Sequence, residues 1–387
     1  MVNENIKENP LKIFSQRAPG RLRLGIFSGP GAKCPILYRM RSKRDKIGGT
    51  GRQGELALLR EIRSRTARRA PGGVRLGIGD DCALLAPRPG EEMAVTTDLS
   101  IAGRHFRMDW HTPEVVGHRV LARGLSDMAA MGARPVAAFL SLGLPRELTV
   151  ATSRRPAWIE RFYDGLLALA DIHKTLLAGG DLAESPIALA DIVLIGAVPR
   201  GRALLRSGAR PGDLIYVTGS LGGAAAGLAR MGELAMTRPG QGQPPRIPKR
   251  MQPLLAAHLY PQPRIAQGLW LQRRGLATAA LDLSDGLSTD LAHLCEESRV
   301  AAAVDATALP VHPAATPDEA LHGGEDYELL FTAPPSSQLP RAIAGVPVTC
   351  IGRILRRQPG MPAMTLVTPE GSQPLEPHGW EHFAPAQ

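Results

Sequence analysis

Residues 114–144, EVVGHRVLARGLSDMAAMGARPVAAFLSLGL, decide the fold class. In the first part of this stretch, apolar side chains recur three and four residues apart, which predicts an amphipathic helix that ends at Gly132, shortly before Pro135. The apolar run at 136–144 predicts a strand. A helix followed directly by a strand is typical of proteins that layer helices on sheets.

The same alternation extends in both directions along the chain. Helices are predicted at 55–69, 157–173 and 221–231, and strands at 75–78, 93–97, 174–178, 187–198 and from Leu214 onward. Residues 208–212 predict a turn between two halves, and residues 232–253, rich in Gly, Pro and Gln, predict a surface loop. We therefore expect an α/β (layered α+β) fold with an N-terminal domain at 51–200 and a C-terminal domain at 201–387.

The net charge of +10 is concentrated at the N-terminus. Of the 387 residues, 44% are hydrophobic and 21% charged, a globular composition that excludes a collagen-like fibre or a small disulfide-rich protein. Residues 1–49 hold eleven Lys and Arg but three Asp and Glu, so they carry +8 and the remainder of the chain +2. We predict that residues 1–50 form a basic, disordered extension. A targeting arm, an electrostatic tether and a dispensable tail remain open alternatives.

The cysteines and the apolar runs bear on location. Four cysteines, Cys34, Cys82, Cys295 and Cys350, form no C-x-x-C pair and are too few for a disulfide framework, which favours a reducing, cytoplasmic compartment. No apolar run reaches the roughly 18 residues of a membrane helix. The N-terminus lacks the apolar core of a secretory signal. The sequence therefore predicts a cytoplasmic protein without a membrane partner.

Six short motifs place acids beside Gly, Ser or Thr, mostly just after apolar segments. They are Gly79-Asp80-Asp81, Thr96-Thr97-Asp98, Ser126-Asp127, Gly179-Gly180-Asp181, residues 282–286 (DLSDG) and residues 323–326 (GGED). One such motif is usually a turn or a helix cap. Six of them, with no basic cluster of matching size, predict carboxylates that converge, repel one another and are neutralised by divalent cations. Because oxygen ligands suit Mg²⁺, we predict a site for several magnesium ions and a nucleotide phosphate.

The usual signatures of other nucleotide and metal sites are missing. The sequence contains no G-x-x-x-x-G-K-[ST] phosphate loop, no H-R-D or D-F-G triplet, and no Cys/His zinc pattern.

The ordered set of motifs resembles the thiamine-monophosphate kinase family, of the superfamily that includes aminoimidazole ribonucleotide synthetase and selenophosphate synthetase. The resemblance runs from about residue 51 to the C-terminus. Its landmarks are GIGDDCALL (77–85), TTD (96–98), GRHF (103–106), LSDMAAMGARP (125–135), GGD (179–181), RSGARPGD (206–213), DLSDGL (282–287), GGEDYELLF (323–331) and GWEHF (379–383). It implies a two-domain, synthetase-like fold whose N-terminal sheets pair across a homodimer.

The resemblance also implies an activity and its residues. The activity is transfer of the γ-phosphoryl group of ATP to thiamine monophosphate, with the ATP and Mg²⁺ site in the N-terminal domain completed by the C-terminal domain. Implied magnesium ligands are Asp81, Thr96, Thr97, Asp98, Asp127, Asp181, Asp282 and Asp285. Implied nucleotide contacts are Tyr163, Gly180, Asp181, Arg206 and Ser284, and implied substrate contacts are His105, Glu325 and Trp380. Asp127, Asp282 and Arg206 are the implied catalytic residues.

The implied chemistry agrees with the residues available. A substrate phosphate oxygen is already ionised at neutral pH, so no general base is required, and positioning and charge neutralisation carry the reaction. Three positions depart from the family pattern: Leu182 follows the GGD motif in place of Thr, Arg104 precedes His105, and Arg123-Gly124 precede the LSD motif in place of a segment ending in Asn.

Two other functions stay open at this point. A sister ATP-dependent synthetase of the same superfamily would act on a different phosphate- or selenide-type substrate, which a substrate panel would reveal. A nucleic-acid binder is suggested by the net charge, and its affinity would reside in residues 1–49 and fall steeply with salt. For the nearly neutral body of the chain we expect no nucleic-acid partner.

Overall fold

The computed structural model describes residues 55–66, 73–78, 82–153, 156–237 and 244–379. All of them belong to one compact unit, Asp45–Gln387. The predicted basic extension at 1–50 and the predicted site residues Asp81 and Trp380 lie outside the described residues, as does Asp80. Within the described part of the chain, no helix has both the length and the apolar character needed to cross a membrane.

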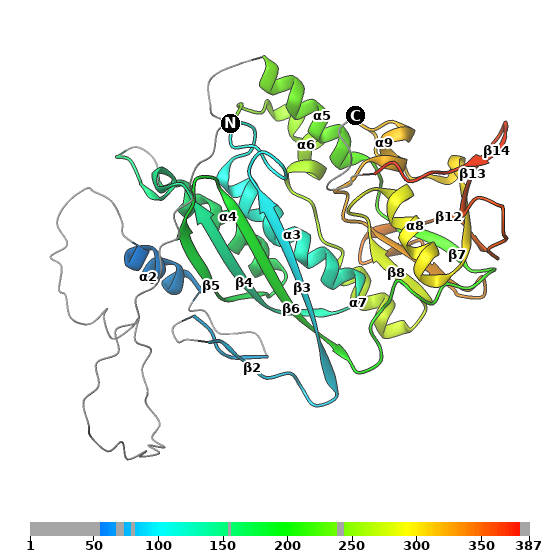
Figure 1. Cartoon of the computed structure of the whole chain (residues 1–387), viewed down its shortest axis with the longest axis horizontal. Coiled ribbons are helices and arrows are strands. Elements are labelled where there is room, and N and C mark those ends of the chain that lie inside the picture. The colour runs from blue at the N-terminus through cyan, green and yellow to red at the C-terminus, as the bar shows by residue number, and fades with distance from the viewer. Residues whose placement is uncertain (1–54, 67–72, 79–81, 154–155, 238–243, 380–387) are drawn as a thin grey trace, which may run out of the picture. The chain divides into compact units, whose positions relative to one another are not determined.

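A four-stranded sheet forms the core of the N-terminal half (Figure 1). Its strands lie in the order β3 (Glu91–Ile101), β6 (Leu189–Pro199), β4 (Arg134–Leu144) and β5 (Leu176–Glu184). Strand β6 pairs antiparallel with β3 and with β4, whereas β4 and β5 are parallel. Parallel neighbours need a crossover connection, and helix α4 (Trp158–Ile172) supplies it.

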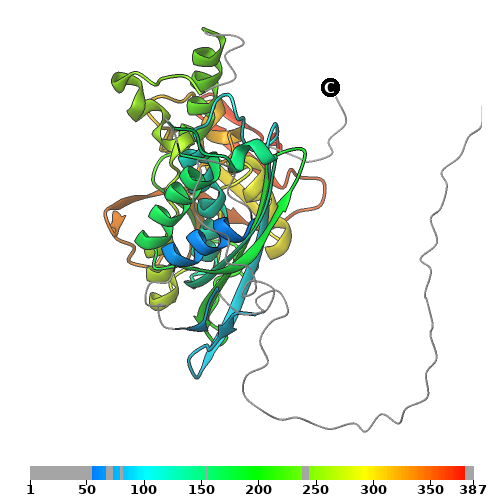
Figure 2. The ribbon, with the colours of Figure 1, turned by 90° about the vertical axis from the view of Figure 1, so that its left-hand side faces the viewer.

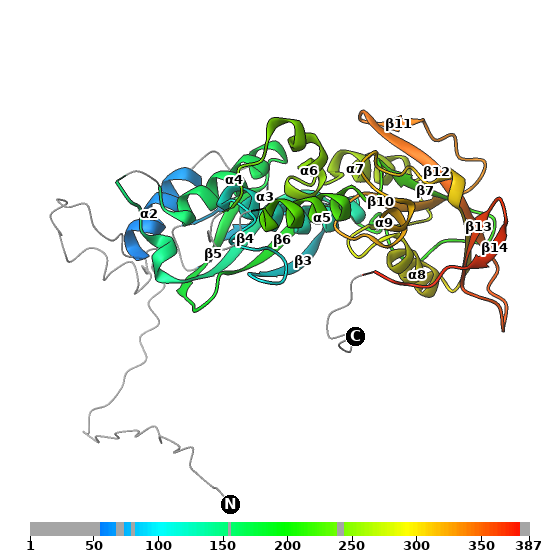
Figure 3. The same cartoon turned by 90° about the horizontal axis from the view of Figure 1, so that it is seen from above.

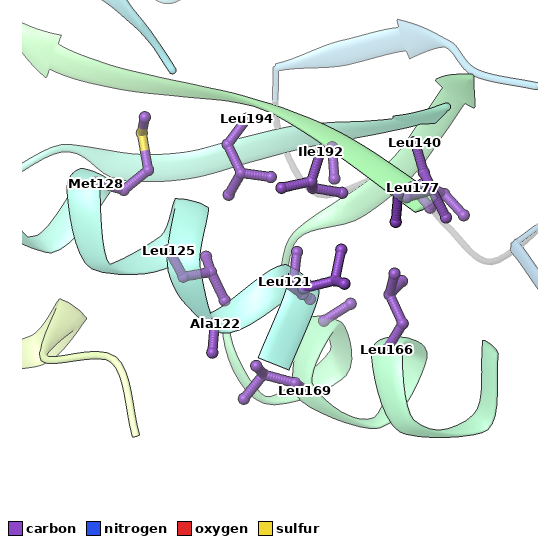
Figure 4. Packing of buried hydrophobic residues seen from close by; sticks show 14 of the residues in the cluster. Leu121, Ala122, Leu125, Met128, Leu140, Leu166, Leu169, Leu177, Ile192 and Leu194 are labelled. Atoms are coloured by element: carbon purple, nitrogen blue, oxygen red, sulfur yellow. The ribbon is translucent and has the colours of Figure 1, made fainter. Parts of the chain in front are cut away.

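Helices α3 (Pro113–Ala130) and α4 cover one face of this sheet, as the close view of the core shows (Figure 4). Leu121 and Leu125 of α3 are fully buried against Ile192 and Leu194 of β6. The two helices approach closely at a glycine, since a Cβ on Gly165 would lie 1.9 Å from the Glu114 carbonyl oxygen. The predicted amphipathic helix and the strand after it are thus confirmed.

Among the described residues, only one pair of short strands covers part of the opposite face of the sheet, and much of that face stays open. Strands β1 (Val74–Leu76) and β2 (Leu84–Leu85) form an antiparallel pair, and Val74 packs with Val136 of β4. Helix α2 (Glu55–Thr66) lies on the α4 side of the sheet, on which the helices gather in Figure 2. Beyond the β1–β2 pair, β3 leaves Val95 62% and Leu99 47% exposed.

In the C-terminal half, the described residues form an eight-stranded mixed sheet and five helices. The order is β14-β13-β9-β12-β7-β10-β8, with β11 paired to β12, and all pairs except β13 with β9 are antiparallel. The strands are β7 (Leu214–Thr218), β8 (Ala279–Asp282), β9 (Ala301–Asp305), β10 (Leu329–Ala333), β11 (Ala342–Ile343), β12 (Val346–Leu355), β13 (Met364–Thr368) and β14 (Gly371–Pro374). The helices are α5 (Gly223–Met236), α6 (Gln252–Leu259), α7 (Ile265–Arg274), α8 (Leu287–Ser298) and α9 (Pro317–His322). Short 3-10 turns occur at η1 (Arg146–Thr149), η2 (Lys249–Met251) and η3 (Ala306–Ala308).

The two halves share a hydrophobic cluster where α3 meets α7 and β8. Leu271 of α7 and Phe331 of β10 are fully buried in the same cluster as the core of the first sheet. A Cβ on Gly268 would lie 2.0 Å from the Ala129 carbonyl oxygen, so the backbones of α7 and α3 touch. Figure 3 shows α5, α6 and α7 at this junction. Helix α3 is therefore fixed on two sides, which matters because it carries site residues.

One predicted loop is partly wrong. Residues 232–253 were expected to form a surface loop, yet α5 continues to Met236 and η2 and α6 begin at Lys249 and Gln252. Met231 of α5 and Leu255 of α6 are fully buried in one small cluster. Burial of these apolar side chains stabilises the two helices despite the Gly and Pro residues between them. The mixed, layered α/β architecture itself is confirmed.

Candidate active site

A cavity of about 470 Å³ opens at the junction of the two halves. It brings together side chains from β3, α3, the end of β8, and the loops at 283–286 and 323–327. Seven of the residues predicted for the site line it: Asp98, His105, Asp127, Asp282, Ser284, Asp285 and Glu325. Motifs that lie up to 227 positions apart in the sequence thus meet around one cavity.

Strand β3 and helix α3 supply the first pair of acids. Side chains alternate along a strand, so Thr96 and Asp98 face α3 whereas Thr97 faces the opposite side of the sheet. The Thr96 hydroxyl donates a hydrogen bond of 2.5 Å to Oδ2 of Asp127, and Nη2 of Arg123 lies 2.6 Å from Oδ1 of Asp98. The structure therefore joins Thr96, Asp98 and Asp127 and separates Thr97 from them.

Asp282 ends strand β8 and is almost fully buried. Its Oδ2 accepts a 2.6 Å hydrogen bond from the hydroxyl of Ser126, the residue before Asp127. Burial raises the pKa of Asp282 to about 7, and the negative charge of Asp127 contributes to the increase. Burial also raises the pKa of Asp127, with a further contribution from Asp98. The carboxylates repel one another, and a cation between them would relieve that repulsion.

The chemistry of these donors fits Mg²⁺. Asp98, Asp127, Asp282 and Asp285 offer only oxygen ligands around one cavity, as hard divalent cations require. Within the described ranges, however, no three Asp, Glu, His or Cys side chains already converge into a metal site. Three of the acids are held instead by protein partners, namely Arg123, Thr96 and Ser126. Metal binding would therefore exchange protein contacts for metal contacts.

Arg206 supplies positive charge from the loop before β7. Its side chain is exposed, and its charge lowers the pKa values of both Asp127 and Asp282 against the raising effect of burial. Ser298 at the end of α8 fixes this loop: its hydroxyl donates to the Arg206 carbonyl oxygen at 3.0 Å and accepts from the backbone N–H of Gly208. Arg206 is thus positioned near the acids without being buried among them.

The loop that carries Ser284 and Asp285 is fixed by a buried acid that sequence reasoning missed. Asp290, in the first turn of α8, accepts hydrogen bonds from the backbone N–H of Asp285 (3.0 Å) and Gly286 (3.1 Å). Burial raises the pKa of Asp290 to about 8. The spacing S-D-G-x-x-x-D could have indicated a carboxylate that folds back on its own turn.

The loop with Glu325 has a strained backbone. Glu325 and Tyr327 have φ angles of +68° and +51°, a conformation that costs free energy for residues other than Gly. Backbone hydrogen bonds of 2.8 Å, from Glu325 to Ser284 and from Tyr327 to Leu283, hold this conformation against the loop after β8. This backbone conformation places Glu325 in the lining of the cavity.

Arg119 of α3 is the charged partner of Glu325 and was also missed. Its Nη2 donates to Oε1 of Glu325 at 2.6 Å, and its Nη1 donates to the His258 carbonyl oxygen. Burial alone would raise the pKa of Glu325, but the Arg119 charge and hydrogen bond lower it below the ordinary value. Arg119, Arg123 and Asp127 recur every four residues, a polar face that the sequence already displays.

Part of the remaining wall of the cavity is apolar and aromatic, beside the basic side chains of Arg104 and Arg107. This apolar part is formed by Phe106, Trp110, Ala224, Ala225 and Leu228. Nδ1 of His105 accepts a 3.1 Å hydrogen bond from the Ile101 backbone N–H, which fixes the ring at the cavity edge. An acidic floor with an apolar wall suits a ligand that is part phosphate and part heterocycle.

The predicted nucleotide residues of the first half line a second cavity, of about 410 Å³. It includes Tyr163, Gly180 and Asp181, beside Leu182. Gly180 has a φ of +143°, and a Cβ there would lie 1.9 Å from the Leu140 carbonyl oxygen, so this position admits only glycine without rearrangement. Because Leu182 packs toward the helices, alternation directs Asp181 to the uncovered face, the face of Thr97.

The strand order separates the two cavities within one chain. Asp98, Ile192, Leu140 and Gly180 are register partners in one row across β3, β6, β4 and β5. Three spacings between neighbouring strands put Asp98 and Gly180 about 14 Å apart. The structure therefore does not bring Tyr163, Gly180 and Asp181 to the first cavity.

The C-terminal tail is held beside the first cavity. The Gly379 backbone N–H donates to the Thr289 hydroxyl at 2.9 Å, and a Cβ on Gly379 would lie 2.0 Å from the Asp285 carbonyl oxygen. The described chain thus ends against the Asp285 loop, one residue before Trp380.

Asp326, a motif residue without an assigned role, caps helix α5. Its two carboxylate oxygens accept from the backbone N–H of Gly222 (2.6 Å) and Ala224 (3.0 Å), at the positive end of the helix dipole. We predict that at pH 4 Asp326→Asn lowers the free energy of unfolding by about 1–3 kcal/mol, because the amide nitrogen cannot accept the second hydrogen bond. Urea denaturation measures the difference.

The pH dependence gives the same prediction a second test. Burial raises the pKa of Asp326 to about 7 from its ordinary 3.8, so the native state retains this proton to higher pH than the unfolded state does. The wild type should therefore lose stability relative to Asp326→Asn as the pH rises from about 4 to 7. A difference that stays constant over this window would contradict a protonated, buried Asp326.

Comparisons with known proteins show the family of this chain. The family model "AIR synthase related protein, N-terminal domain" matches residues 79–198, and the model of its C-terminal domain matches residues 210–359. The thiamine-monophosphate kinase of Escherichia coli K12 is 39% identical over 343 residues, which cover 86% of this chain and 98% of that protein.

Two solved structures are similar over most of their length. The thiamine-monophosphate kinase of Stenotrophomonas maltophilia K279a superposes with a TM-score of 0.67 at 41% identity, covering 79% of this chain and 95% of that one. AaThiL complexed with AMPPCP and TMP has a TM-score of 0.64 at 28% identity, covering 87% of this chain and all of that one.

Proposed function

The chain belongs to the thiamine-monophosphate kinase family, and from that premise we propose that the cavity between its two halves is where ATP phosphorylates thiamine monophosphate. The reaction is an ATP-dependent phosphoryl transfer that yields thiamine diphosphate and ADP. Relatives of this name match nearly their whole length, and a related protein has been solved with AMPPCP and TMP.

One observation carries the assignment of the site. The 470 Å³ cavity collects four acids from both halves (Asp98, Asp127, Asp282 and Asp285) with Ser284, His105 and Glu325, and part of its wall is apolar. Acids alone would also suit other phosphate chemistry. The combination with Phe106 and Trp110 accommodates the aromatic rings of thiamine, which is why we place thiamine monophosphate here.

The chain's own residues act by positioning and by balancing charge. A phosphate oxygen of thiamine monophosphate is the nucleophile and is already ionised, so no side chain needs to remove a proton. Arg206 is placed to stabilise the negative charge on the transferred phosphoryl group. Arg119 and the strained backbone hold Glu325 toward the cavity, where its carboxylate can contact the cationic substrate.

Magnesium is the cofactor we propose for this site. Asp98, Asp127, Asp282 and Asp285 would hold it at the first cavity, with Thr96 in support, and Thr97 and Asp181 present oxygens on the other sheet face. Bound Mg²⁺ would neutralise the phosphates and orient ATP. Asp81 and Trp380 keep their proposed metal and substrate roles from the family resemblance.

We also propose a homodimer. The uncovered sheet face exposes Val95 and Leu99, and a second copy would bury them. Val95→Glu should shift the sedimenting species from dimer to monomer. Ile172→Glu, at an equally exposed position (67%) on α4, should leave the dimer intact.

The compartment we propose is the cytoplasm. Cys82, Cys295 and Cys350 are free thiols in the structure, which suits a reducing environment.

A substrate panel tests the proposed function. Purified full-length protein with ATP and Mg²⁺ should convert thiamine monophosphate to thiamine diphosphate with one ADP per turnover, resolved by chromatography. It should leave ribonucleotide amides and selenide unchanged. ADP formation that depends on one of those compounds would identify the sister synthetase activity instead.

A further inference from the structure

Arg123 is a cation built into the acidic cavity. It lies on α3, one turn after Arg119 and one turn before Asp127, and it lines the cavity with Asp98, Asp127 and Asp285. Its Nη2 atom lies 2.6 Å from Oδ1 of Asp98, and the two side chains are only 18% and 20% exposed. An arginine in this place neutralises a carboxylate that is otherwise a candidate metal ligand.

The ion pair leaves Arg123 incompletely satisfied. Its Nε atom is buried, and within the described part of the chain it has no hydrogen-bond partner. A guanidinium can donate five hydrogen bonds, and a buried donor without a partner costs free energy. The pair with Asp98 therefore satisfies only part of the hydrogen-bonding capacity of Arg123.

The positive charge of Arg123 acts on two further acids that line the cavity. It lowers the pKa of Asp127, opposing the effects of burial and of Asp98, and it also lowers the pKa of Glu325. Arg123 thus lies between the metal-side acids and the substrate-side acid. A divalent cation that approached Asp98 would meet this positive charge at a few ångströms.

We propose that Arg123 and a divalent cation compete for Asp98: the arginine holds the carboxylate in the metal-free protein, and metal binding displaces it. This inference rests on the proposed magnesium site. It accounts for the finding that, among the described residues, the cavity offers oxygen donors of which no three converge, because the Asp98 carboxylate is held toward the Arg123 guanidinium.

The test is the metal affinity of Arg123→Gln, measured in full-length protein without nucleotide. Titration with Mn²⁺, followed by electron paramagnetic resonance of the free ion, gives the dissociation constant directly. Loss of a unit positive charge a few ångströms from the metal should tighten binding about tenfold or more. The metal-free variant should also melt at lower temperature than the wild type, and Mn²⁺ should raise its melting temperature by more.

Two matched variants separate charge from general damage. Arg134→Gln breaks the pair between Arg134 of β4 and Glu91 of β3 (3.1 Å) on the same sheet outside the cavity, and should leave Mn²⁺ affinity unchanged. Arg123→Lys keeps the charge and should bind Mn²⁺ like the wild type. If Arg123→Gln does not fold, Arg123→Met, which keeps the length without the charge, carries the same expectation.

The possible results have distinct meanings. Unchanged or weaker Mn²⁺ binding by Arg123→Gln, with normal binding by the wild type, would overturn the competition. A wild-type protein that binds no divalent cation would instead overturn the proposed magnesium site. Tighter binding by Arg123→Gln, or by Arg123→Met in its place, with wild-type affinity in Arg134→Gln and Arg123→Lys, supports the inference.

Discussion

Asp282→Asn is expected to lower kcat for thiamine diphosphate formation by about 10²–10³-fold or more. Asp282 ends β8 inside the cavity and is almost fully buried. The negative charge of Asp127 makes ionisation of Asp282 less favourable. Asparagine keeps the shape and can still accept the hydrogen bond of Ser126, but it removes the charge that would hold a metal ion and its phosphate.

The fold should survive this change. Because the pKa of Asp282 is raised to about 7, its ionised form is unfavourable in the metal-free protein, so Asp282→Asn should be at least as stable as the wild type above pH 7. Circular dichroism melts and steady-state kinetics test both statements. Asp305→Asn, at a fully exposed acid before η3, is the matched control and should keep full kcat. Turnover by Asp282→Asn within a few fold of wild type would contradict the role of Asp282.

Arg206→Ala is expected to reduce kcat by about 10²–10³-fold with a smaller change in KM for either substrate. Its side chain is exposed, and Ser298 holds its backbone carbonyl rather than its guanidinium, so little packing is lost with the side chain. Its effect on the pKa values of Asp127 and Asp282 shows that its charge reaches the acids where the phosphates would lie.

Arg210→Ala is the control for this loop. Arg210 is also exposed and lies four residues away, and its backbone N–H rather than its side chain bonds to Asp213. It should keep wild-type kcat. A rise in KM for ATP without a fall in kcat in Arg206→Ala would show that Arg206 binds the nucleotide equally in the ground and transition states.

Periodicity predicted the elements that bury one clear face. The apolar stripe of α3 and the run that became β4 were readable because a helix and a strand impose different spacings on buried residues. The length of α5 could not be predicted, since Gly232 and the prolines beyond it favour a loop. The helix continues because Met231 is buried in one cluster with Leu255 of α6.

The motifs predicted which acids matter, but not how they are held. Asp98, Asp127 and Asp282 were expected on the strength of their neighbours in sequence. Arg119 and Asp290 were not, because a lone charge on a helix is usually solvated and nothing local reports its burial. Local sequence patterns do not determine the order in which strands pair. The distance between Asp98 and Gly180 therefore became known only from the strand order of the sheet.

The central claim is that this chain passes the terminal phosphoryl group of ATP to thiamine monophosphate. Single-turnover reaction with [γ-³²P]ATP, Mg²⁺ and excess thiamine monophosphate tests it most directly. The label should appear in the terminal phosphate of thiamine diphosphate, and chelation of Mg²⁺ should abolish its transfer. Label released as inorganic phosphate, with no labelled thiamine diphosphate formed, would contradict the claim.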